Sequence, residues 1–373
     1  MKKQTEVEEK IERLTRLLAA ENLGGVLLAG QHNFAWATAG GRSGIDESRD
    51  AGECALFVRR DGRRFVIASR IEMPRLLAEE LNGLDFEPVE YGWEDDKINP
   101  ALVVEHARKL MAKDAELGAD APAGDARIVE TQIAQARYRL TDGELGRFRA
   151  LGHDAGATVA TVARGLEPGL SEREVARRVT DALAARDIQT FVTLVAADER
   201  LTNFRHPVPT DKCWEKIVMI VVCARRAGLI ASLTRIVCAG DIPEDLRMRT
   251  RAAATVNAAL FAGTKAGATG KELYEVAARE YAANGFEGEQ HKHHQGGAAG
   301  YRARDWVAHP ACDEVVVERQ AFAWNPSITG TKIEETCILI DGEIEIITKS
   351  PDWNYITVER DGREYRLPDV MGL

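Results

Sequence analysis

The 373-residue chain lacks an excess of positive charge, because 59 Asp and Glu residues outnumber 49 Lys and Arg residues and give a formal net charge of −10. Nucleic acids and anionic membranes require a basic face on their protein partners, so we expect neither as a partner. No apolar run approaches the length of about 20 residues that crosses a bilayer. The N-terminal segment MKKQTEVEEKIERL turns acidic and has no apolar stretch of the signal-peptide kind. These absences predict a cytoplasmic protein that acts on a small molecule.

Paired cysteines are also missing. The chain has six cysteines, none of them in a C-x-x-C pair: Cys54, Cys213, Cys223, Cys238, Cys312 and Cys337. Each stands among apolar neighbours, as buried free thiols do. We therefore expect a reduced protein with no zinc ribbon and no redox centre, and nothing in the composition implies a cofactor.

The first third of the chain alternates helical and extended patterns. Apolar residues recur at helical spacing over 6–22, and the buried-strand pattern GGVLLAG follows at 24–30. Residues 53–69, ECALFVRRDGRRFVIAS, hold two strand-like runs around an Asp-Gly pair, which predicts a β-hairpin. A helix over 70–81 and a strand over 86–92 complete the pattern of an α/β domain.

The rest of the chain predicts pairs of helices that alternate with pairs of antiparallel strands. Helices are expected to start at two capping boxes, Thr141 with Glu144 and Ser171 with Glu174. Residues 215–240 contain two apolar strands around a tight connection. Two more helices and three more strands are expected at 243–262, 270–284, 321–328, 332–341 and 343–348. This alternation is typical of an α+β domain built from two similar halves.

A histidine cluster stands out in the segment HKHHQGGAAG, where His291, His293 and His294 fall within four positions. Side chains two apart on a strand share a face, so His291 and His293 could hold a first-row metal by themselves. The alternative is a polar surface loop between strands. The glycines that follow are expected to serve tight turns or close backbone approach.

Five segments, in order and with compatible spacing, carry a resemblance to a known family. They are GQHNFAWATAGGR, RHPVPTDKCWEKIVMIVVCARRAGLIASLTRIVCAG, HHQGGAAGY, FAWNPSI and TKIEETCILI. The chain resembles the pita-bread superfamily, peptidase family M24, which includes methionine aminopeptidase, aminopeptidase P, prolidase and creatinase. The resemblance implies a creatinase-type N-terminal α/β domain over residues 1–137 and an α+β pita-bread domain over residues 138–373. It also implies a homodimer.

The resemblance further implies two divalent ions held by two Asp, one His and two Glu, but most of these ligands are replaced. The second Glu is kept as Glu334, whereas the other four positions carry Val221, Ser232, Gly297 and Asn325. Valine and glycine side chains offer no ligand atom. We therefore expect no metal ion at these positions, with the remaining carboxylate balanced by Lys332, Arg235 or a protonated histidine.

Two histidines outside the family's ligand set remain. His206 occupies the His-x-x-Pro position and His293 the first His of H-x-x-G-H. Creatinase, as a member of this family, lacks metals and cleaves a C–N bond with a histidine at the position of His206. A near-neutral imidazole can activate water and then protonate a leaving nitrogen. The resemblance thus implies His206, His293 and Glu334 as catalytic residues, and the candidate substrate-binding residues are Asn325, Tyr301, Arg302 and Arg235.

Three functions follow from these residues. The first is a metal-independent hydrolase that cleaves a C–N bond in a small polar amidine or amide. The second is a binding protein without turnover, because the superfamily includes histone-chaperone and growth-regulating members whose pocket serves recognition. The third, a metal-dependent Xaa-Pro peptidase, is disfavoured by the four replaced ligands. If these residues have no catalytic role, His206 is a histidine in a loop and Glu334 lies on the outward face of a strand.

Overall fold

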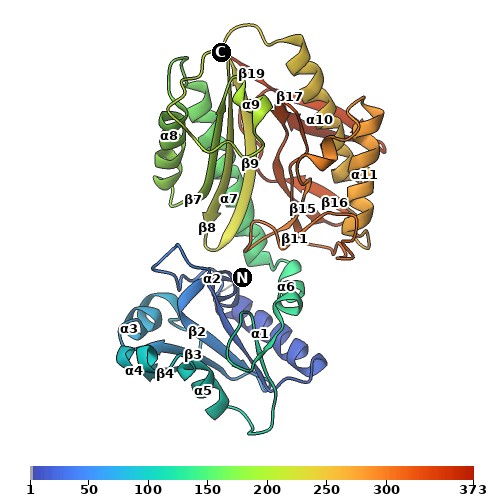
Figure 1. Ribbon diagram of the computed structural model, residues 1–373. Coiled ribbons are helices and arrows are strands. Elements are labelled where there is room, and N and C mark those ends of the chain that lie inside the picture. The colour runs from blue at the N-terminus through green and yellow to red at the C-terminus, as the bar shows by residue number, and fades with distance from the viewer. Residues whose placement is uncertain (1–2) are drawn as a thin grey trace. The chain divides into compact units, whose positions relative to one another are not determined.

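The computed structural model describes residues 3–373, and the chain forms two compact units, Met1–Leu145 and Gly146–Leu373 (Figure 1). The boundary expected at residue 137 lies near the end of helix α6 (Glu130–Tyr138), and the division between the units lies in the first turn of α7 (Asp142–Arg164). Among the described residues, no helix has the length and apolar character of a bilayer span.

The N-terminal unit contains one six-stranded mixed sheet in the order β4-β3-β2-β1-β5-β6. Its strands are β1 (Gly25–Gly30), β2 (Ala51–Arg59), β3 (Arg64–Ser69), β4 (Glu87–Tyr91), β5 (Leu117–Ala119) and β6 (Arg127–Ile128). The main helices of this unit are α1 (Lys3–Ala20), α2 (Gln31–Ala37), α4 (Trp93–Ile98), α5 (Leu102–Lys109) and α6. The predicted α/β domain is confirmed.

The expected hairpin over 53–69 is confirmed as β2 and β3, which pair antiparallel with Phe57 opposite Phe65. The helix expected over 70–81 is only partly correct. It consists of one short turn, α3 (Met73–Arg75), followed by a π-helical segment, η1 (Leu76–Glu80). Pro74 lies in that first turn, where its missing N–H is tolerated.

The C-terminal unit holds a four-stranded sheet, β19-β9-β8-β7, and a five-stranded sheet, β11-β10-β12-β15-β16. The first sheet is made of β7 (Gln189–Ala197), β8 (Ile217–Arg226), β9 (Leu229–Cys238) and β19 (Met371–Gly372). The second is made of β10 (Gly296–Ala299), β11 (Trp306–Val307), β12 (Ala321–Trp324), β15 (Glu335–Ile340) and β16 (Glu343–Ile346). Two hairpins accompany them: β13 (Ser327–Ile328) with β14 (Thr331–Lys332), and β17 (Tyr355–Arg360) with β18 (Arg363–Pro368).

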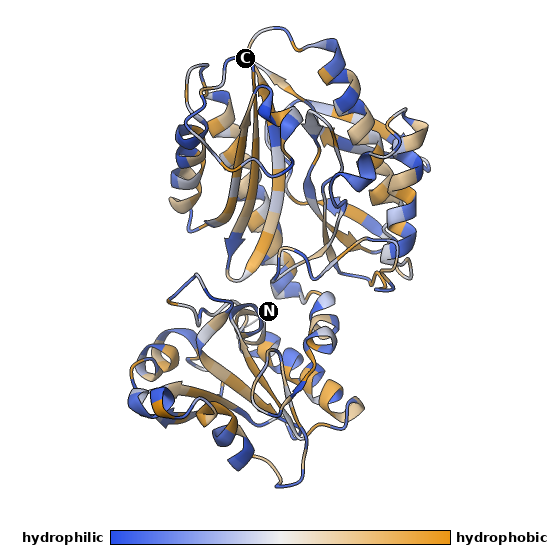
Figure 2. Ribbon diagram, viewed as in Figure 1, coloured by the Kyte–Doolittle hydropathy of each residue, from blue (hydrophilic) through white to orange (hydrophobic). Residues whose placement is uncertain are grey.

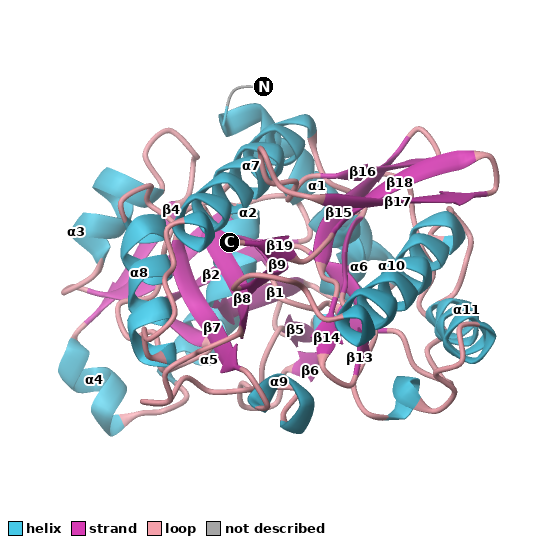
Figure 3. Ribbon diagram, turned by 90° about the horizontal axis from the view of Figure 1, so that it is seen from above, coloured by secondary structure: helices cyan, strands magenta, loops and turns pink. Residues whose placement is uncertain are grey.

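Helices enclose these sheets, as expected for the predicted α+β domain. They are α7, α8 (Glu172–Ala184), α9 (Arg200–Asn203), α10 (Glu244–Gly263) and α11 (Gly270–Ala283). In Figures 1 and 3, α8 lies beside β7, while α10 lies with α11 on the other side of the unit, next to β17. Figure 2 shows the strands mostly in hydrophobic colours and the outward-facing parts of the helices in blue. The apolar core therefore lies between the helices, on the strands.

Both capping boxes are confirmed. The side chain of Glu144 accepts a hydrogen bond from the backbone N–H of Thr141 at 2.7 Å, and the hydroxyl of Thr141 accepts one from the N–H of Glu144 at 3.2 Å. Ser171 and Glu174 cap α8 in the same reciprocal way. These local signals placed the first two helices of the domain correctly.

The predicted pair of strands over 215–240 is confirmed as β8 and β9, joined by a two-residue turn. Ala227 and Gly228 both have positive φ angles, 50° and 79°, as a type I′ hairpin turn requires. The turn sets a register in which Cys223 lies opposite Ser232 and Val221 opposite Thr234. Because paired residues of antiparallel strands share a face, these four side chains lie on one side of the sheet.

The start of β15 in the second sheet meets the edge of β9 at these residues. The backbone N–H of Thr234 donates to the carbonyl of Glu334 at 3.2 Å, and the N–H of Ser232 donates to the hydroxyl of Thr336 at 2.7 Å. These bonds hold Glu334, just before β15, against the middle of β9. The two sheets are therefore joined at the position where the retained family carboxylate lies.

Candidate active site

Two loops of the C-terminal unit bring histidines together. His206 lies in the loop after α9, and His293 and His294 lie between η2 (Glu289–His291) and β10. Glu289 joins the two loops, since its carboxylate pairs with Arg205 at 2.6 Å and accepts from the N–H of Thr329 at 2.9 Å. Arg205 precedes His206 in the chain. The buried Glu289 carboxylate therefore fixes the loop that carries one histidine relative to the loop that carries the other two.

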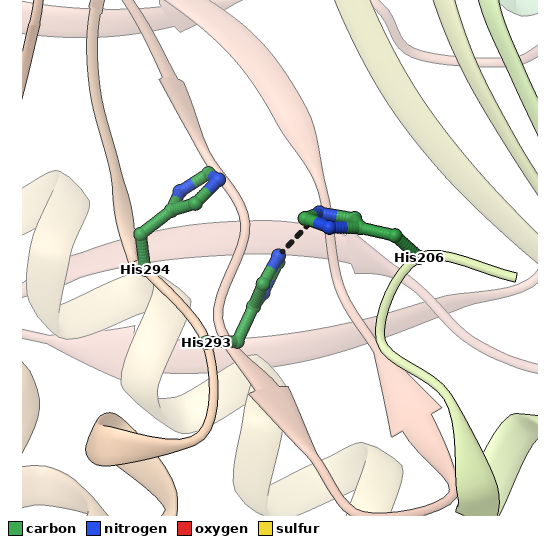
Figure 4. Close-up of side chains that lie close together, drawn as sticks. All are labelled: His206, His293 and His294. Atoms are coloured by element: carbon green, nitrogen blue, oxygen red, sulfur yellow. Dashed lines mark hydrogen bonds between the residues drawn. The ribbon is translucent and has the colours of Figure 1, made fainter.

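The imidazoles of His206 and His293 are in direct contact. Their Nε2 atoms lie 3.1 Å apart, and their ring planes meet at 73°. The His294 ring lies 4.5 Å from the His293 ring and 6.2 Å from the His206 ring, measured between centroids. Figure 4 shows the three side chains around one space, with the dashed line between His206 and His293. One nitrogen from each ring lies within 4.8 Å of the others.

Asn325 determines which nitrogen of His293 carries the proton. Arg304 donates to the Asn325 oxygen at 2.9 Å, and the Asn325 amide nitrogen donates to the carbonyl of His294 at 3.2 Å. With the amide oriented in this way, the same nitrogen faces His293 Nδ1 at 3.4 Å. A neutral imidazole has one donor and one acceptor nitrogen. We therefore assign the proton of His293 to Nε2, which donates to Nε2 of His206.

All three imidazoles favour the neutral form. Burial, reinforced by the charge of Lys332, lowers the pKa of His293 to about 2. Burial and then the charge of Arg304 lower the pKa of His294 to about 4. Burial, followed by Lys332, also lowers the pKa of His206, and Glu334 only partly opposes the effect. At neutral pH the cluster therefore offers unprotonated nitrogens that can accept a proton.

The Glu334 carboxylate is ionised, and both of its oxygens contact protein groups. Its side chain is only 3% exposed. One oxygen contacts Lys332 Nζ at 2.9 Å and accepts from the Thr234 hydroxyl at 2.8 Å, and the other accepts from Arg304 at 3.3 Å. Burial opposes ionisation, but the two cations outweigh it and hold the pKa of Glu334 below its usual value. Two cations around one carboxylate leave the centre with one excess positive charge.

The residues at the family's metal positions do not fit a two-ion centre. Val221 lies in an apolar cluster with Met219 and Ile236. The hydroxyl of Ser232 donates to the sulfur of Cys223 at 3.3 Å. Asn325 and Glu334 are bound to Arg304 and Lys332, as described above. The only anionic group among the aligned positions is thus already paired with cations of the protein.

Gly297 shows the misfit most directly. A Cβ atom built on Gly297 would lie 2.0 Å from the carbonyl oxygen of Trp306, far inside van der Waals contact. Gly297 pairs with Val307 across the β10–β11 ladder, so the obstructing atom belongs to the neighbouring strand. No side chain, and in particular no ligand histidine, fits at this position without movement of the backbone.

We predict that Gly297→Ala lowers the free energy of unfolding by about 1–3 kcal/mol or more, because the added methyl forces β10 and β11 apart. Gly146→Ala is the matched control: Gly146 lies in α7, and nothing within 4 Å would meet its added Cβ. That change should stabilise the protein by about 0.5–1 kcal/mol. Urea unfolding of both variants measures the difference. Equal stability of the two variants would contradict the close approach at Gly297.

Two of the four residues proposed to bind substrate have a clear place relative to the cluster. Asn325 lies in it, with its amide nitrogen 3.4 Å from His293 Nδ1. Arg235 does not join it: its fully buried guanidinium pairs with Glu335 at 2.9 Å and donates to the carbonyl of Thr348 at 2.7 Å. Arg235 follows Thr234 on β9, and successive side chains of a strand point to opposite faces. Since Thr234 binds Glu334, Arg235 lies on the other face, and it does not balance Glu334.

The other two lie in the β10–β11 loop, where Tyr301 is buried and Arg302 is exposed. The residue of this loop that reaches Glu334 is Arg304, which the sequence did not single out for that role. His294 was likewise not expected to join His206. The only sequence signal for Arg304 is its place in the basic stretch YRARDW.

The metal pair considered for His291 and His293 is not formed. The His291 ring contacts the Tyr274 hydroxyl at 3.4 Å and the Gln290 amide at 3.2 Å. His291 belongs to η2 and not to a strand, so the expected alternation does not apply. Its place beside His293 is taken by His206, which is distant in the sequence.

Comparisons with known proteins agree with this architecture. The model of metallopeptidase family M24 matches residues 147–347, more than half of the chain. The chain is similar in structure to an Xaa-Pro dipeptidase from Bacillus anthracis, with 19% identity, a TM-score of 0.75 and coverage of 98% of this chain and 100% of that one. The dipeptidase PepE from Mycobacterium ulcerans gives 17% identity, a TM-score of 0.78 and coverage of 99% and 98%.

A third similar structure is the N-terminal domain of the FACT complex subunit SPT16 from Cicer arietinum (chickpea), with 10% identity, a TM-score of 0.70 and coverage of 93% of this chain and 96% of that one. The search of curated proteins gave no significant match. At these identities the structural matches show the fold, and they confirm the predicted N-terminal α/β domain followed by a pita-bread domain. With the family model matched over most of its C-terminal unit, the chain belongs to metallopeptidase family M24.

Proposed function

We propose that this M24 protein is a hydrolase that cleaves a C–N bond in a small polar amidine or amide without the family's two metal ions. The observation that carries the proposal is the contact between His206 and His293, 3.1 Å apart, beside a carboxylate held by two cations. A hydrolytic site needs a base for water, an acid for the leaving nitrogen and a positive group for the developing oxyanion. The cluster provides a candidate for each.

His206 serves as the base and then as the acid. In the resting site the Nε2 lone pair of His206 accepts from His293. When water takes the place of His293 as its partner, this nitrogen accepts a proton from the water while the water oxygen bonds to the substrate carbon. The same proton then passes from His206 to the substrate nitrogen as the C–N bond breaks, so the imidazole ends the cycle neutral. His293 donates from Nε2 to His206 and holds that ring in place, and the Asn325 amide fixes the orientation of His293.

Lys332 and Arg304 provide the positive charge. In metal-dependent hydrolases the ion stabilises the negative charge that develops on oxygen. Here the two cations converge on Glu334, which neutralises only one of them. Burial and then the charges of Arg304 and Lys332 lower the pKa of nearby His294. Glu334 therefore acts as a positioning residue for the two cations, since its own oxygens are occupied by protein partners.

The test uses protein treated with a chelator and checked by elemental analysis. We expect it to hydrolyse at least one compound of a panel of guanidino compounds, amides and imidodipeptides. The rate should be the same before and after chelation, because the proposed proton transfers use only side chains. A protein that retains two divalent ions per chain, and that loses its activity with them, would contradict the metal-independent mechanism.

A binding protein without turnover is the second candidate. The observation that favours it is the same loss of four ligand positions, because a site without metal ions can serve recognition alone. In that case a compound of the panel should raise the melting temperature without being hydrolysed, as expected of any ligand that binds the folded state. Hydrolysis of that compound would exclude this candidate.

A further inference from the structure

We propose that His206, His293 and His294 form a binding site for a single zinc ion, at a place distinct from the family's two-ion centre. None of the five ligand positions of that centre contributes to the site. The three histidines come from two loops, and each directs one nitrogen into the shared space (Figure 4). The site thus arises from side chains that the resemblance assigns to other roles or to none.

The spacing fits the geometry of zinc. Zn–N bonds of 2.0–2.1 Å at a tetrahedral angle place two ligand nitrogens about 3.3 Å apart. The Nε2 atoms of His206 and His293 are already 3.1 Å apart, so the two rings need to turn toward a common point and not to change their separation by much. The nitrogen of His294 lies within 4.8 Å of both and needs a short inward shift. Within residues 3–373, no hydrogen bond restrains the His294 ring, so a rotation of its side chain can supply that shift.

The donor chemistry favours a transition metal over magnesium or calcium. All three ligand atoms are imidazole nitrogens, which suit zinc and its neighbours, whereas hard cations require oxygen shells. A zinc-bound histidine usually donates its other ring N–H to a nearby acceptor. The Ser327 hydroxyl lies 3.3 Å from His293 Nδ1 and can accept that N–H once zinc replaces the proton on Nε2 and the Asn325 amide, 3.4 Å from the same atom, turns its N–H away. The exposed side of the cluster leaves a fourth position for water.

The net positive charge around the cluster should lower its affinity for zinc. Lys332 and Arg304 repel a divalent cation, and Glu334 cancels only one of them. Affinity should therefore fall below that of closed sites with thiolate ligands. Bound zinc also takes the Nε2 lone pair of His206. If that lone pair is the base of the proposed hydrolase, zinc inhibits the reaction; this second step rests on the proposed function, whereas the binding itself does not.

Calorimetric titration of chelator-treated protein with zinc tests the binding. We expect one ion per chain, and at least about a 10-fold loss of affinity in His294→Ala, since even the loss of an outer hydrogen-bond partner costs 10–100-fold. His291→Ala is the matched control and should bind like the wild type, because His291 lies outside the cluster. Cobalt added in place of zinc should give the visible absorption of a tetrahedral site, which His294→Ala should lose. Equal melting temperatures exclude misfolding of the variants.

Absence of a stoichiometric ion, or full affinity in His294→Ala, would overturn the proposal. The inhibitory step has a separate readout in hydrolysis. Zinc should inhibit the wild type and should inhibit His294→Ala far less, when the rate of each protein with zinc is compared with its own rate without zinc. Activation by zinc would refute the inhibitory step and the metal-independent mechanism together. Zinc binding in a protein that hydrolyses nothing would support the site and count against the proposed function, so the two failures are distinguishable.

Discussion

Replacing His206 with glutamine should lower kcat/KM for the hydrolysed compound by about 100-fold to 10,000-fold, the usual contribution of a general acid–base residue. Glutamine keeps a polar group of similar size but cannot carry the proton from water to nitrogen. The measurement is steady-state hydrolysis of the compound found in the metal-free screen. His291→Gln is the matched control and should leave the rate unchanged, because the polar contacts of the His291 ring are with Tyr274 and Gln290, outside the cluster. Activity that survives in His206→Gln would reject His206 as the base.

The pH profile gives this prediction a second readout. His206 must be neutral to accept a proton, and burial together with Lys332 lowers its pKa from 6.5, against the weaker opposing effect of Glu334. His293, which faces it, stays neutral throughout this range. We therefore expect kcat/KM to be level above pH 6.5 and to fall only below it, as His206 becomes protonated. An acid limb centred above that value would mean that another group is the base.

Replacing Lys332 with methionine should destabilise the protein by about 3 kcal/mol, the lower end of the range for breaking a buried ion pair. Lys332 is 6% exposed and Glu334 3%, so the carboxylate cannot gain water in exchange. Arg304 remains at 3.3 Å and limits the loss. Urea unfolding measures the change. Lys265→Met is the matched control, since Lys265 is 66% exposed and lies 3.9 Å from its partner Asp361, and it should change stability by less than about 1 kcal/mol.

The double variant Lys332→Met with Glu334→Gln separates the charge from the packing. Removing the carboxylate charge together with the ammonium should recover part of the lost stability, because it relieves the under-paired buried anion while leaving Arg304 without its ion partner. If the double variant is as unstable as Lys332→Met alone, the lysine stem contributes packing and the ion pair contributes little.

Local signals in the sequence predicted much of the C-terminal unit. Each capping box spans four residues, from Thr141 to Glu144 and from Ser171 to Glu174, and the hairpin of β8 and β9 closes through a two-residue turn. Such features depend on neighbours in the chain, so they are visible in the sequence. The same local approach was less successful for 70–81, where a helical pattern becomes a short turn and a π-helical segment.

The candidate site could be predicted only in part, because it is assembled over long sequence separations. His206 and His293 are 87 positions apart, and Arg304 and Glu334 are 30 apart. The family resemblance supplied His206, His293 and Glu334 by position. It could not show that Arg304 enters the centre, since the basic stretch offers two arginines and only the conformation of the loop selects one.

Only part of the placement of Arg235 could be predicted from the sequence. Strand alternation puts Thr234 and Arg235 on opposite faces of β9, so only one of them can face Glu334. The strand itself was predicted, but which face it turns toward β15 depends on the register with Ser232 and Thr336. That register is a tertiary property, and it decides that the arginine pairs with Glu335 instead.

The close approach of the Trp306 carbonyl to Gly297 also affects whether a substitution could restore the two-ion centre. The volume that a ligand imidazole would fill is occupied by the main chain of β11, with the Trp306 carbonyl 2.0 Å from the missing Cβ. A Gly297→His substitution would therefore clash with the backbone of β11, and the clash would destabilise the fold whether or not an ion is bound. A ligand side chain at this position would therefore require a movement of the β11 backbone as well as the change of residue.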